Sequence, residues 1–329
     1  MNLEGKAMNG KIIVTGGAGF IGSNIVKALN IEGYNQIIIV DHLTDNGKWK
    51  NLIDLKFIAY FDRNDFLEEL KKDNPLFKDV KIIIHMGACT NTTEKNENYI
   101  IDNNTIYSKY LFDYAKGRNI RFIYASSAAT YGNGSKGYND KELDLQPLNC
   151  YGYSKYLFDQ WVLNSKEKPL QWVGLKFFNV FGPKEYHKGQ MASVVYHGYH
   201  QVIKDGEIRL FKSYKAQYKD GEQKRDFIYV KDAVRVVLFL INNPHINGIF
   251  NVGTGEARTF LDLAISVFRA LNLKPNIRFI DMPEHLKDKY QYFTEADISS
   301  LRNAGYSEEF TPLESAIEDY VVNYLKKLS

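Results

Sequence analysis

The stretch Thr15-Gly16-Gly17-Ala18-Gly19-Phe20-Ile21-Gly22 decides the fold class of this chain. It follows an apolar run of strand length and precedes a pattern typical of a helix. Gly17, Gly19 and Gly22 satisfy G-x-G-x-x-G, and Gly16 extends the set to G-x-x-G-x-x-G. Glycines at this spacing permit a tight turn and let a pyrophosphate approach the backbone at the helix N-terminus. The stretch therefore predicts a strand, loop and helix that bind a dinucleotide.

Short apolar, β-branched runs alternate with helical patterns through the first half of the chain. The runs are Lys11 to Thr15, Gln36 to Val40, Leu55 to Tyr60, Lys81 to His85, Arg121 to Ser126 and Gln171 to Phe177. This alternation is typical of βαβ units that build a buried parallel sheet. We therefore expect an α/β fold with a Rossmann-type, doubly wound parallel sheet.

The alternation of strand and helix patterns is interrupted after Phe177, where longer, glycine-containing loops begin. It resumes with a strand near Asp226 to Val230 and a helix from Lys231 to Asn242. This change predicts a second, smaller α/β substrate domain that is interleaved with the first. We expect a dinucleotide-binding domain from residues 1–178 and 226–250, and a substrate domain from residues 179–225 and 251–329.

Size and composition describe an ordinary globular protein. The chain has 329 residues, of which 44% are hydrophobic, and a net charge of +3 from 42 basic and 39 acidic residues. So slight a charge gives no argument for nucleic acid as a partner. The longest apolar runs, such as Ile37-Ile38-Ile39-Val40, have strand length, so we expect no membrane span. Cys89 and Cys150 lack metal-ligand spacing and no apolar signal segment precedes Lys11, which predicts free thiols and a cytoplasmic location.

Positive charge is concentrated in one region of the second half. Between Lys184 and Arg225, nine Lys and Arg residues stand against five Asp and Glu residues, an excess of four. Either a solvated surface or a site for an anionic substrate explains this excess. His197 and His200 in the same region lie three residues apart, but no cysteine or carboxylate nearby completes a metal-binding set. We therefore predict no metal site.

Asp41 is the candidate ligand for the adenosine ribose of the cofactor. It closes the second predicted strand, 19 residues after Gly22, near the spacing expected for that role. By itself it favours NAD. Lys48, Lys50 and Arg63 follow in the next loops, where cations could receive the 2′-phosphate of NADP. These residues leave the choice between NAD and NADP open.

Two further segments lie where such a fold passes its cofactor. Gly87-Ala88-Cys89-Thr90 follows the fourth predicted strand, and Asn103 starts the next helical pattern. Each could equally be ordinary turn chemistry.

A serine, a tyrosine and a lysine form the candidate catalytic set. Ser126-Ser127 lies at the carboxyl end of the fifth predicted strand, where open α/β sheets bind their ligands. Tyr151 and Lys155 lie four residues apart, on one face of a helix predicted to run through Leu163. A free tyrosine has a pKa of about 10, so a general base near neutrality needs a shift of roughly three pKa units. Lys155 and a positive nicotinamide ring are the expected sources of that shift.

With these motifs the chain resembles the extended short-chain dehydrogenase/reductase superfamily over nearly its whole length. The match includes the glycine loop, Ser127, the Tyr-x-x-x-Lys motif and Arg225-Asp226-Phe227-Ile228-Tyr229-Val230. The resemblance implies that Ser127 positions the substrate, that Tyr151 is the acid/base, and that Lys155 binds ribose and lowers the tyrosine pKa. Sugar dehydratases of the superfamily typically carry Thr-Asp-Glu where Ser127-Ala128-Ala129 stands, so elimination of water is not expected. Epimerisation and simple oxidation or reduction remain.

The stretch from Phe178 to Ser193 narrows the resemblance. Asn-Val-Phe-Gly-Pro is general to the superfamily, whereas His-Lys-Gly-Gln-Met-Ala-Ser at residues 187–193 is similar to the sugar-nucleotide epimerases that invert C6 of an ADP-linked glycero-manno-heptose for lipopolysaccharide inner-core synthesis. The resemblance implies a 6-keto intermediate, tightly bound NADP, and Lys188 as a second base that serves one epimer while Tyr151 serves the other. Without it, Lys188 would be interpreted as a surface lysine in a basic loop.

The same resemblance implies the ligand contacts. Residues expected at the cofactor are Gly16, Gly19, Phe20, Ile21, Gly22, Asp41, His42, Lys48, Arg63, Met86, Gly87, Ala88, Cys89, Thr90, Asn103, Lys155, Val180 and Lys188. Residues expected at the ADP-heptose substrate are Asn179, Gln190, His197, Phe211, Lys212, Ser213, Tyr214, Arg225 and Tyr290. Arg225 is the natural pyrophosphate clamp because its planar guanidinium can bind two phosphate oxygens. The family often has Ser where Gln190 stands, and the loop from Phe211 to Tyr214 also differs. The resemblance further implies NADP, with NAD as the alternative, and a homopentamer.

Three functions follow from these observations. An NADP-dependent sugar-nucleotide 6-epimerase uses Tyr151, Lys155 and Lys188 together. Another nucleotide-sugar epimerase or reductase, such as a UDP-sugar 4-epimerase, is the alternative within the superfamily. A nucleotide-sensing module without turnover fits poorly, because the full Ser, Tyr and Lys set is present.

Overall fold

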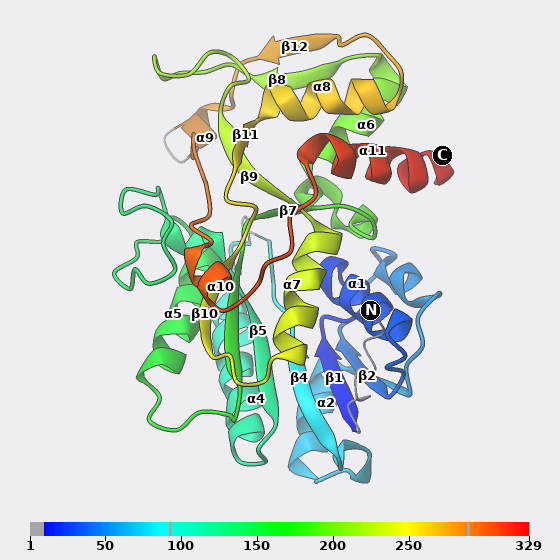
Figure 1. The fold of residues 1–329 in the computed structure, drawn as a ribbon, viewed down its shortest axis with the longest axis vertical. Helices are drawn as coiled ribbons and strands as arrows, with labels where there is room; N and C mark the ends of the chain where they lie inside the picture. Colours follow the sequence, from blue (N-terminus) through cyan, green and yellow to red (C-terminus); the bar gives the residue numbers. More distant parts are fainter. Residues whose placement is uncertain (1–9, 92–93, 288–289, 329) are drawn as a thin grey trace.

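The computed structural model of the chain describes residues 10–91, 94–287 and 290–328 (Figure 1). Residues 1–9 of the predicted dinucleotide-binding domain lie outside this part. The strands are β1 (Lys11–Thr15), β2 (Ile37–Asp41), β3 (Ala59–Asp62), β4 (Val80–His85), β5 (Arg121–Ser127), β6 (Trp172–Phe177), β7 (Asn179–Phe181), β8 (Ile208–Phe211), β9 (Lys224–Tyr229), β10 (Gly248–Val252), β11 (Ala257–Thr259) and β12 (Ile277–Ile280). The α-helices are α1 (Phe20–Ile31), α2 (Arg63–Lys71), α3 (Glu97–Ile101), α4 (Tyr107–Lys116), α5 (Cys150–Asn164), α6 (Val194–Asp205), α7 (Val230–Asn242), α8 (Phe260–Ala270), α9 (Glu284–Lys287), α10 (Ser299–Asn303) and α11 (Leu313–Asn323).

The large sheet has seven strands, all parallel, in the order β10-β6-β5-β4-β1-β2-β3. The strand order reverses between β1 and β4, so the loops that follow these two strands diverge. Ligands of doubly wound sheets bind outside the carboxyl ends of the strands at such a reversal. The predicted fold class is therefore confirmed, and the topology places a binding site beside the glycine loop.

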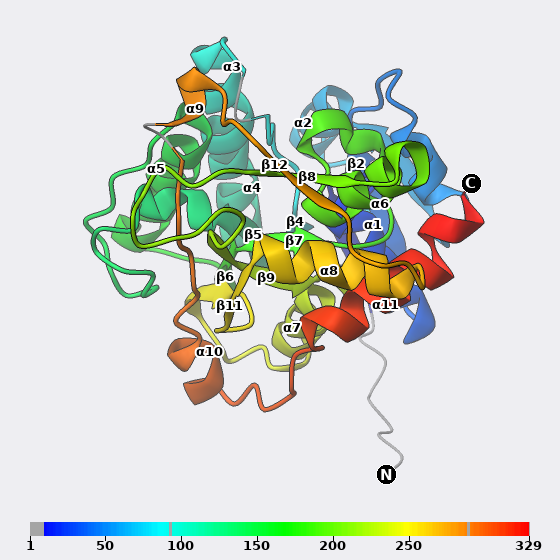
Figure 2. The same cartoon turned by 90° about the horizontal axis from the view of Figure 1, so that it is seen from above.

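The two faces of the large sheet bury different side chains, because successive residues of a strand point to opposite sides. Ile12 and Val14 of β1 belong to a core cluster that includes residues of α1 and α7. Ile13, between them, belongs to a second cluster with residues of α2, α4 and α5. Figure 2 shows helices on both sides of the strands. Near-continuous apolar strands such as β2 are the expected result of burial on both faces.

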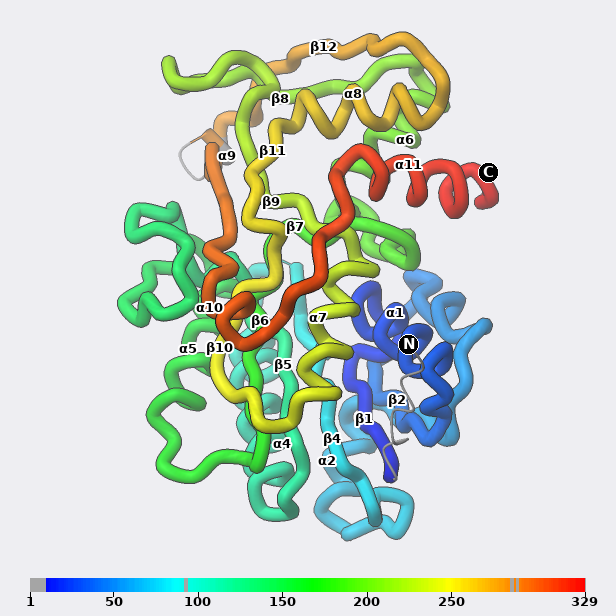
Figure 3. The backbone as a smooth tube through the Cα atoms, in the orientation of Figure 1, coloured from blue at the N-terminus to red at the C-terminus, as the bar shows by residue number. Residues whose placement is uncertain are grey.

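The smaller sheets lie above the carboxyl ends of the large one (Figure 1). One has the order β11-β9-β7 and the other pairs β12 with β8. The first core cluster continues without a break from the large sheet into α6, α8 and α11. The chain then descends from β12 to α10, which contacts β10, and returns to α11 (Figure 3). The predicted boundary after residue 250 falls inside β10, and the division into domains stays a prediction.

Several elements differ from the sequence-based expectation, and the small-sheet strands β7, β8, β11 and β12 were not predicted. The third strand begins at Ala59 rather than Leu55, because pairing with β2 starts only at the Ala59–Ile38 pair. The helix predicted to start at Asn103 begins at Glu97, where the Asn96 side chain accepts a hydrogen bond from the Tyr99 N–H at 3.1 Å. The edge strand β10 has no counterpart among the predicted strands. Within the described ranges, no helix is long and apolar enough to cross a membrane.

Candidate active site

The glycine loop is shaped by two close backbone approaches. Gly16 has a φ of 67°, and a Cβ on it would lie 2.7 Å from the Gly87 nitrogen. A Cβ on Gly22 would lie 2.1 Å from the Gly16 carbonyl oxygen. Gly19 is the N-cap of α1 and offers no side-chain hydrogen bond. The first N–H groups of α1 therefore have no capping side chain, which is the arrangement that binds a pyrophosphate.

Asp41, at the end of β2, makes several hydrogen bonds in the predicted ribose site. Its carboxylate accepts hydrogen bonds from the Ala18 N–H at 2.8 Å, the His42 N–H at 2.7 Å and Lys48 Nζ at 2.6 Å. The first bond ties β2 to the glycine loop. The third places an ammonium against the carboxylate, so the local charge that a ribose 2′ group meets is close to neutral.

A cavity of about 210 Å³ opens at the reversal point of the sheet, between the ends of β1, β2 and β4. It brings together many of the predicted cofactor residues, namely Gly16, Asp41, His42, Lys48, Arg63, Gly87, Ala88, Cys89 and Asn103. The cavity is also lined by six residues that the sequence analysis did not predict, namely Thr15, Val40, Thr44, Asn46, Tyr99 and Tyr107. Only Thr15 carried a sequence signal, as the last residue before the glycine loop; nothing marked Tyr99 or Tyr107, which reach the cavity from the α3 and α4 helices.

The remaining predicted cofactor residues do not line this cavity. Phe20, Ile21 and Gly22 form the first turn of α1 after Gly19. Met86 and Thr90 flank the segment after β4 that lines the cavity. Val180 lies in β7, whereas Lys155 and Lys188 come from α5 and from a short 3-10 turn, η5 (Tyr186–Met191).

The predicted catalytic set meets at the carboxyl end of β5. Asn149 caps α5 by accepting a hydrogen bond from the Gly152 N–H at 2.8 Å, which sets Tyr151 in the first turn. Ser127, the last residue of β5, lies close enough to Tyr151 for its hydroxyl to lower the pKa of the phenol. Lys155, one turn further along α5, donates from Nζ to the Ala125 carbonyl oxygen at 2.7 Å. The three residues are thus held by one strand and one helix.

Burial dominates the electrostatics of this set. It raises the pKa of Tyr151, and the Ser127 hydroxyl lowers that pKa by less. It lowers the pKa of Lys155 to about 8, with Asp159 acting in the opposite direction. The protein groups alone therefore do not produce the predicted lowering of the Tyr151 pKa, because the desolvation cost of a buried phenolate outweighs them.

Asp159 lies beneath Lys155 in a buried polar network. Its carboxylate accepts hydrogen bonds from the Tyr124 hydroxyl at 3.0 Å and the Ser126 hydroxyl at 2.6 Å. Burial raises the pKa of Asp159, and the nearby Lys176 ammonium is the largest opposing influence. This network fixes the strand that carries Ser127 to the helix that carries Tyr151.

Lys188 faces the glycine loop. Its Nζ lies 5.3 Å from the centroid of the Phe20 ring, in the first turn of α1. Burial lowers the pKa of Lys188, whereas the Glu185 carboxylate raises it. A desolvated lysine with a lowered pKa can donate a proton as the ammonium and accept one as the neutral amine. Lys188 is therefore not the freely solvated lysine that a basic surface loop would carry.

Glu185 holds the two ends of the loop that carries Lys188. It is fully buried, and its carboxylate accepts hydrogen bonds from the Gly182 N–H at 3.2 Å, the Ser193 N–H at 2.6 Å and the Ser193 hydroxyl at 2.7 Å. Asn51 ties the loop to the glycine loop by donating to the carbonyls of Lys184 and Ala18, each at 3.0 Å. Both positioning residues were missed, because their partners are distant in the sequence or belong to the backbone.

Arg225 forms the centre of the predicted substrate cluster. It is 7% exposed, and its guanidinium lies 5.2 Å from the Tyr290 ring centroid and 5.6 Å from that of Phe260. Phe211 packs edge-on against Tyr290. Burial lowers the pKa of Arg225, and among the residues that the structure describes no carboxylate forms an ion pair with it. A buried arginine without an acid partner is well suited to bind an anion.

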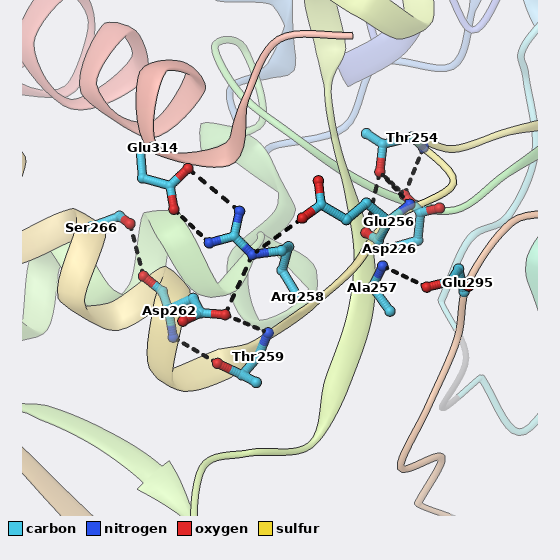
Figure 4. Close-up of polar contacts among 10 residues, drawn as sticks. All are labelled: Asp226, Thr254, Glu256, Ala257, Arg258, Thr259, Asp262, Ser266, Glu295 and Glu314. Carbon is cyan, nitrogen blue, oxygen red and sulfur yellow. Dashed lines mark hydrogen bonds and ion pairs between the residues drawn. The ribbon is translucent and has the colours of Figure 1, made fainter.

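Asp226 follows Arg225 on β9 and anchors this strand, and Figure 4 shows its hydrogen bonds with Thr254. Its carboxylate accepts hydrogen bonds from the Thr254 N–H, the Thr254 hydroxyl, the Gly255 N–H and the Ala296 N–H, at 2.7 to 3.0 Å. On the neighbouring strand β11, Arg258 pairs with Glu314 of α11. These contacts hold β9, and with it Arg225, against the end of β10 and the returning C-terminal segment.

The other predicted substrate residues lie farther apart. Asn179 begins β7 and Gln190 lies in η5, and both are exposed. His197 lies on α6 beside the Tyr196 ring. Lys212 and the Tyr214 hydroxyl contact Asp281, and the Ser213 N–H donates to Asp220. No group of three His, Cys, Asp or Glu side chains that could hold a metal ion occurs among the residues of the described ranges.

Comparisons with known proteins agree over almost the whole chain. A profile of the NAD dependent epimerase/dehydratase family matches residues 12–253. The chain is 50% identical to the ADP-L-glycero-D-manno-heptose-6-epimerase of Fusobacterium nucleatum, over 96% of this chain and 98% of that protein. It is also 50% identical to the protein of the same name from Nitratidesulfovibrio vulgaris, over 95% and 97%. The solved structure of the Helicobacter pylori ADP-L-glycero-D-manno-heptose-6-epimerase matches with a TM-score of 0.82 and 28% identity, over 98% of this chain and 99% of that chain.

Proposed function

This chain belongs to the NAD dependent epimerase/dehydratase family, and from that premise we propose that it is an isomerase that interconverts ADP-D-glycero-D-manno-heptose and ADP-L-glycero-D-manno-heptose at C6. The observation that carries the proposal is 50% identity to two proteins named ADP-L-glycero-D-manno-heptose-6-epimerase, each over at least 95% of this chain. The product serves lipopolysaccharide inner-core synthesis.

The site supports epimerisation rather than elimination. Elimination of water needs an acid and a base close to the reacting carbons, and the residues beside Ser127 are Ala128 and Ala129. A nicotinamide cofactor, when bound, supplies reversible hydride transfer. The chain itself then has to hold the substrate oxygen, and to take and return its proton. We assign these roles to Ser127 at the carboxyl end of β5 and to Tyr151 in the first turn of α5.

Inversion at an exocyclic carbon requires that the substrate oxygen meets a proton donor in two poses. Tyr151 serves one epimer and Lys188 serves the other. The contact of Lys188 with Phe20 supports this role, since it directs the ammonium towards the first turn of the cofactor-binding helix. The lowered pKa of Lys188 supports it as well, because a neutral amine becomes accessible at a lower pH than on a solvated lysine.

The buried cluster around Arg225 binds the diphosphate of the substrate. Its aromatic neighbours Phe260 and Tyr290 desolvate the guanidinium, which strengthens its attraction for phosphate oxygens. We assign the nucleotide contact to Phe211, which packs edge-on against Tyr290 beside Arg225.

NADP is the proposed cofactor, with NAD as the weaker ligand. The cavity at the end of β2 contains Lys48, Arg63 and His42, and Lys48 neutralises the Asp41 carboxylate that would otherwise repel a 2′-phosphate. His42 itself pairs with Asp62 at 2.8 Å, so Arg63 is the main candidate to receive the phosphate. We further propose that the protein is a homopentamer and acts in the cytoplasm. A monomer in sedimentation velocity would contradict the proposed oligomeric state.

The decisive experiment uses purified protein and ADP-D-glycero-D-manno-heptose, without added cofactor, in deuterated water. The configuration at C6 is monitored by NMR. We expect inversion at C6 without incorporation of solvent deuterium at that carbon, because the hydride returns from a cofactor that stays bound. Absence of inversion, together with inversion of UDP-glucose at C4, would favour the alternative epimerase. Deuterium at C6 would exclude direct hydride return.

Arg63→Ala tests the cofactor assignment separately. Loss of one charge-assisted hydrogen bond should raise the Kd of NADP by about 10-fold or more, while the Kd of NAD stays unchanged. Lys71→Ala, a lysine at the end of α2 away from the cavity, is the charge-matched control. An equal loss for both cofactors would assign Arg63 a general electrostatic role.

A further inference from the structure

A second cavity lies apart from the cofactor cavity and the catalytic set. Its volume is about 290 Å³. Three segments that are distant in the sequence form its wall: the connection from β5 to α5, the loop between β8 and β9, and the segment before α10. The wall includes Asn133, Tyr138, Lys215, Gln217, Tyr218 and Tyr292. This volume is near the lower limit for small-molecule sites, so the cavity suits a ligand of about one sugar ring.

A row of aromatic rings connects Arg225 with the wall of this cavity. The Arg225 guanidinium lies 5.2 Å from the centroid of the Tyr290 ring, and the Tyr290 and Tyr292 rings pack edge-on with their centroids 5.5 Å apart. The Tyr292 hydroxyl accepts a hydrogen bond from the Tyr214 N–H at 2.9 Å, which fixes this ring. Tyr290 belongs to the predicted substrate site and Tyr292 lines the second cavity, so the two sites are neighbours.

The loop between β8 and β9 supplies most of the polar groups of the cavity. Lys215 Nζ lies 4.7 Å from the centroid of the Tyr292 ring, which holds the ammonium against the aromatic wall. In the part of the chain that the structure describes, the Lys215 ammonium, the Gln217 carboxamide and the Tyr218 hydroxyl have no hydrogen-bond or ion-pair partner, and no carboxylate lines the cavity. A cation with neighbouring amide and hydroxyl groups suits a ligand that carries hydroxyl groups and a negative charge.

The orientation of the rings favours a sugar over a flat base. The Tyr218 and Tyr292 rings have centroids 5.3 Å apart and planes inclined at 42°. The planes of Tyr138 and the neighbouring Phe293 are inclined at 57°, and this pair is fixed because the Tyr138 hydroxyl donates to the Phe293 carbonyl at 2.5 Å. A flat nucleobase stacks best on a parallel ring. The C–H groups of a sugar chair point in several directions and therefore fit inclined rings.

We propose that this cavity is a second ligand site that binds an anionic monosaccharide, with the negative group on Lys215 and the sugar ring against Tyr218 and Tyr292. It is separate from the site proposed for ADP-heptose, because none of its lining residues is among the predicted catalytic, cofactor or substrate residues. The proposal does not depend on the proposed function, since binding to the cavity is measured without turnover.

The test is isothermal titration calorimetry of the full-length protein with D-mannose 6-phosphate as the probe. D-mannose, which lacks the anion, and inorganic phosphate, which lacks the ring, are titrated in parallel. We expect saturable binding of D-mannose 6-phosphate, with a Kd about 10-fold lower than that of either comparison ligand. In Lys215→Ala the preference for D-mannose 6-phosphate over D-mannose should disappear. Tyr218→Ala should raise the Kd of both sugars by about 5-fold.

Lys219→Ala is the matched control for the loss of a loop cation. Lys219 is exposed on the same loop but does not line the cavity, so all three affinities should stay unchanged. Equal losses in Lys215→Ala and Lys219→Ala would indicate a general attraction for anions and would overturn the proposal. Absence of saturable binding, or equal affinity for inorganic phosphate and D-mannose 6-phosphate, would overturn it as well.

Saturation with ADP distinguishes the cavity from the proposed substrate site. Binding of ADP is measured first, and its absence would count against the proposed function but not against the second site. We expect the protein saturated with ADP still to bind D-mannose 6-phosphate, and Lys215→Ala to bind ADP like the native protein. Loss of D-mannose 6-phosphate binding in the presence of ADP would assign the cavity to the substrate site and would overturn the proposal.

Discussion

The two proposed bases are carried by regions of opposite construction. Tyr151 lies in the first turn of a 15-residue helix whose next turn contains the fully buried Ser154 and the nearly buried Lys155. Lys188 lies in a short 3-10 turn in which Gly189, Gln190 and Met191 are exposed. The helix is fastened to its surroundings at several points, whereas the loop depends chiefly on the Glu185 carboxylate.

This difference suggests a division of labour in the proposed reaction. A base on a rigid helix fixes one position for the substrate oxygen, and that position is set by the fold. A base on a loop can adjust to the second pose of the sugar at little cost, because few buried contacts have to change. The same contrast predicts that substitutions around α5 change the alignment of the substrate with the cofactor. Substitutions in the loop that carries Lys188 should change the rate of only one half-reaction.

Tyr151→Phe should have the largest effect. It removes the proton acceptor while keeping the ring and the helix, so the oxidation of one epimer should slow by about 10³-fold. The measurement is the absorbance of the bound reduced nicotinamide after mixing with a single epimer. Thermal unfolding should remain close to that of the native protein, and a large fall in Tm would instead indicate a structural role for the hydroxyl.

Lys188→Ala should slow the corresponding half-reaction of the other epimer by about 10²-fold. Net epimerisation slows in both directions, because the overall equilibrium fixes the ratio of the two kcat/KM values. The two half-reactions, measured separately, therefore distinguish the bases. Lys184→Ala, on the same loop and paired with Asp54, controls for the loss of a loop cation. An unaffected rate for this epimer in Lys188→Ala would exclude Lys188 as its base.

Glu185→Gln should act on Lys188 alone, with a loss of roughly 10-fold in its half-reaction. An amide cannot accept all the hydrogen bonds from Gly182 and Ser193, so the loop loosens. Its charge also matters: the carboxylate raises the pKa of Lys188, and its removal lowers that pKa further. A neutral amine is the form that accepts a proton, so this half-reaction rises with pH through the Lys188 pKa. The rise should therefore move to lower pH in the variant, and a shift to higher pH would contradict the assignment.

Local motifs were readable from the sequence, and long-range contacts were not. The glycine loop, Ser127 and the Tyr151–Lys155 pair were predicted because each is set by its own element: a turn, a strand end or one helical turn. Asn51 and Glu185 were not predicted, since a buried amide or carboxylate resembles any polar residue of a helix or loop until its partners are known. The strand β10 was missed for a similar reason: it is short, lies at the sheet edge, and begins at a glycine with a φ of 134°.

Gly189→Ala should have the smallest effect and the most local one. Gly189 has a φ of 54°, and a Cβ there would meet nothing within 4 Å, so the added methyl group costs backbone strain alone. That strain is roughly 1–2 kcal/mol. It falls on the turn that carries Lys188, and we expect the Lys188-dependent half-reaction to slow by up to about 5-fold while the Tyr151-dependent one is unchanged.

Gly206→Ala makes this last prediction sharp. Gly206 has a φ of 69° and equally open surroundings, but it ends α6 at the surface. The two variants should therefore lose similar stability, and only Gly189→Ala should change a rate. If both half-reactions slowed together in Gly189→Ala, the loop would be part of the same rigid unit as α5. The hypothesis that the Lys188 loop adjusts to the second pose of the sugar would then be wrong, even if Lys188 is the second base. Both poses of the substrate would instead be aligned by one rigid unit.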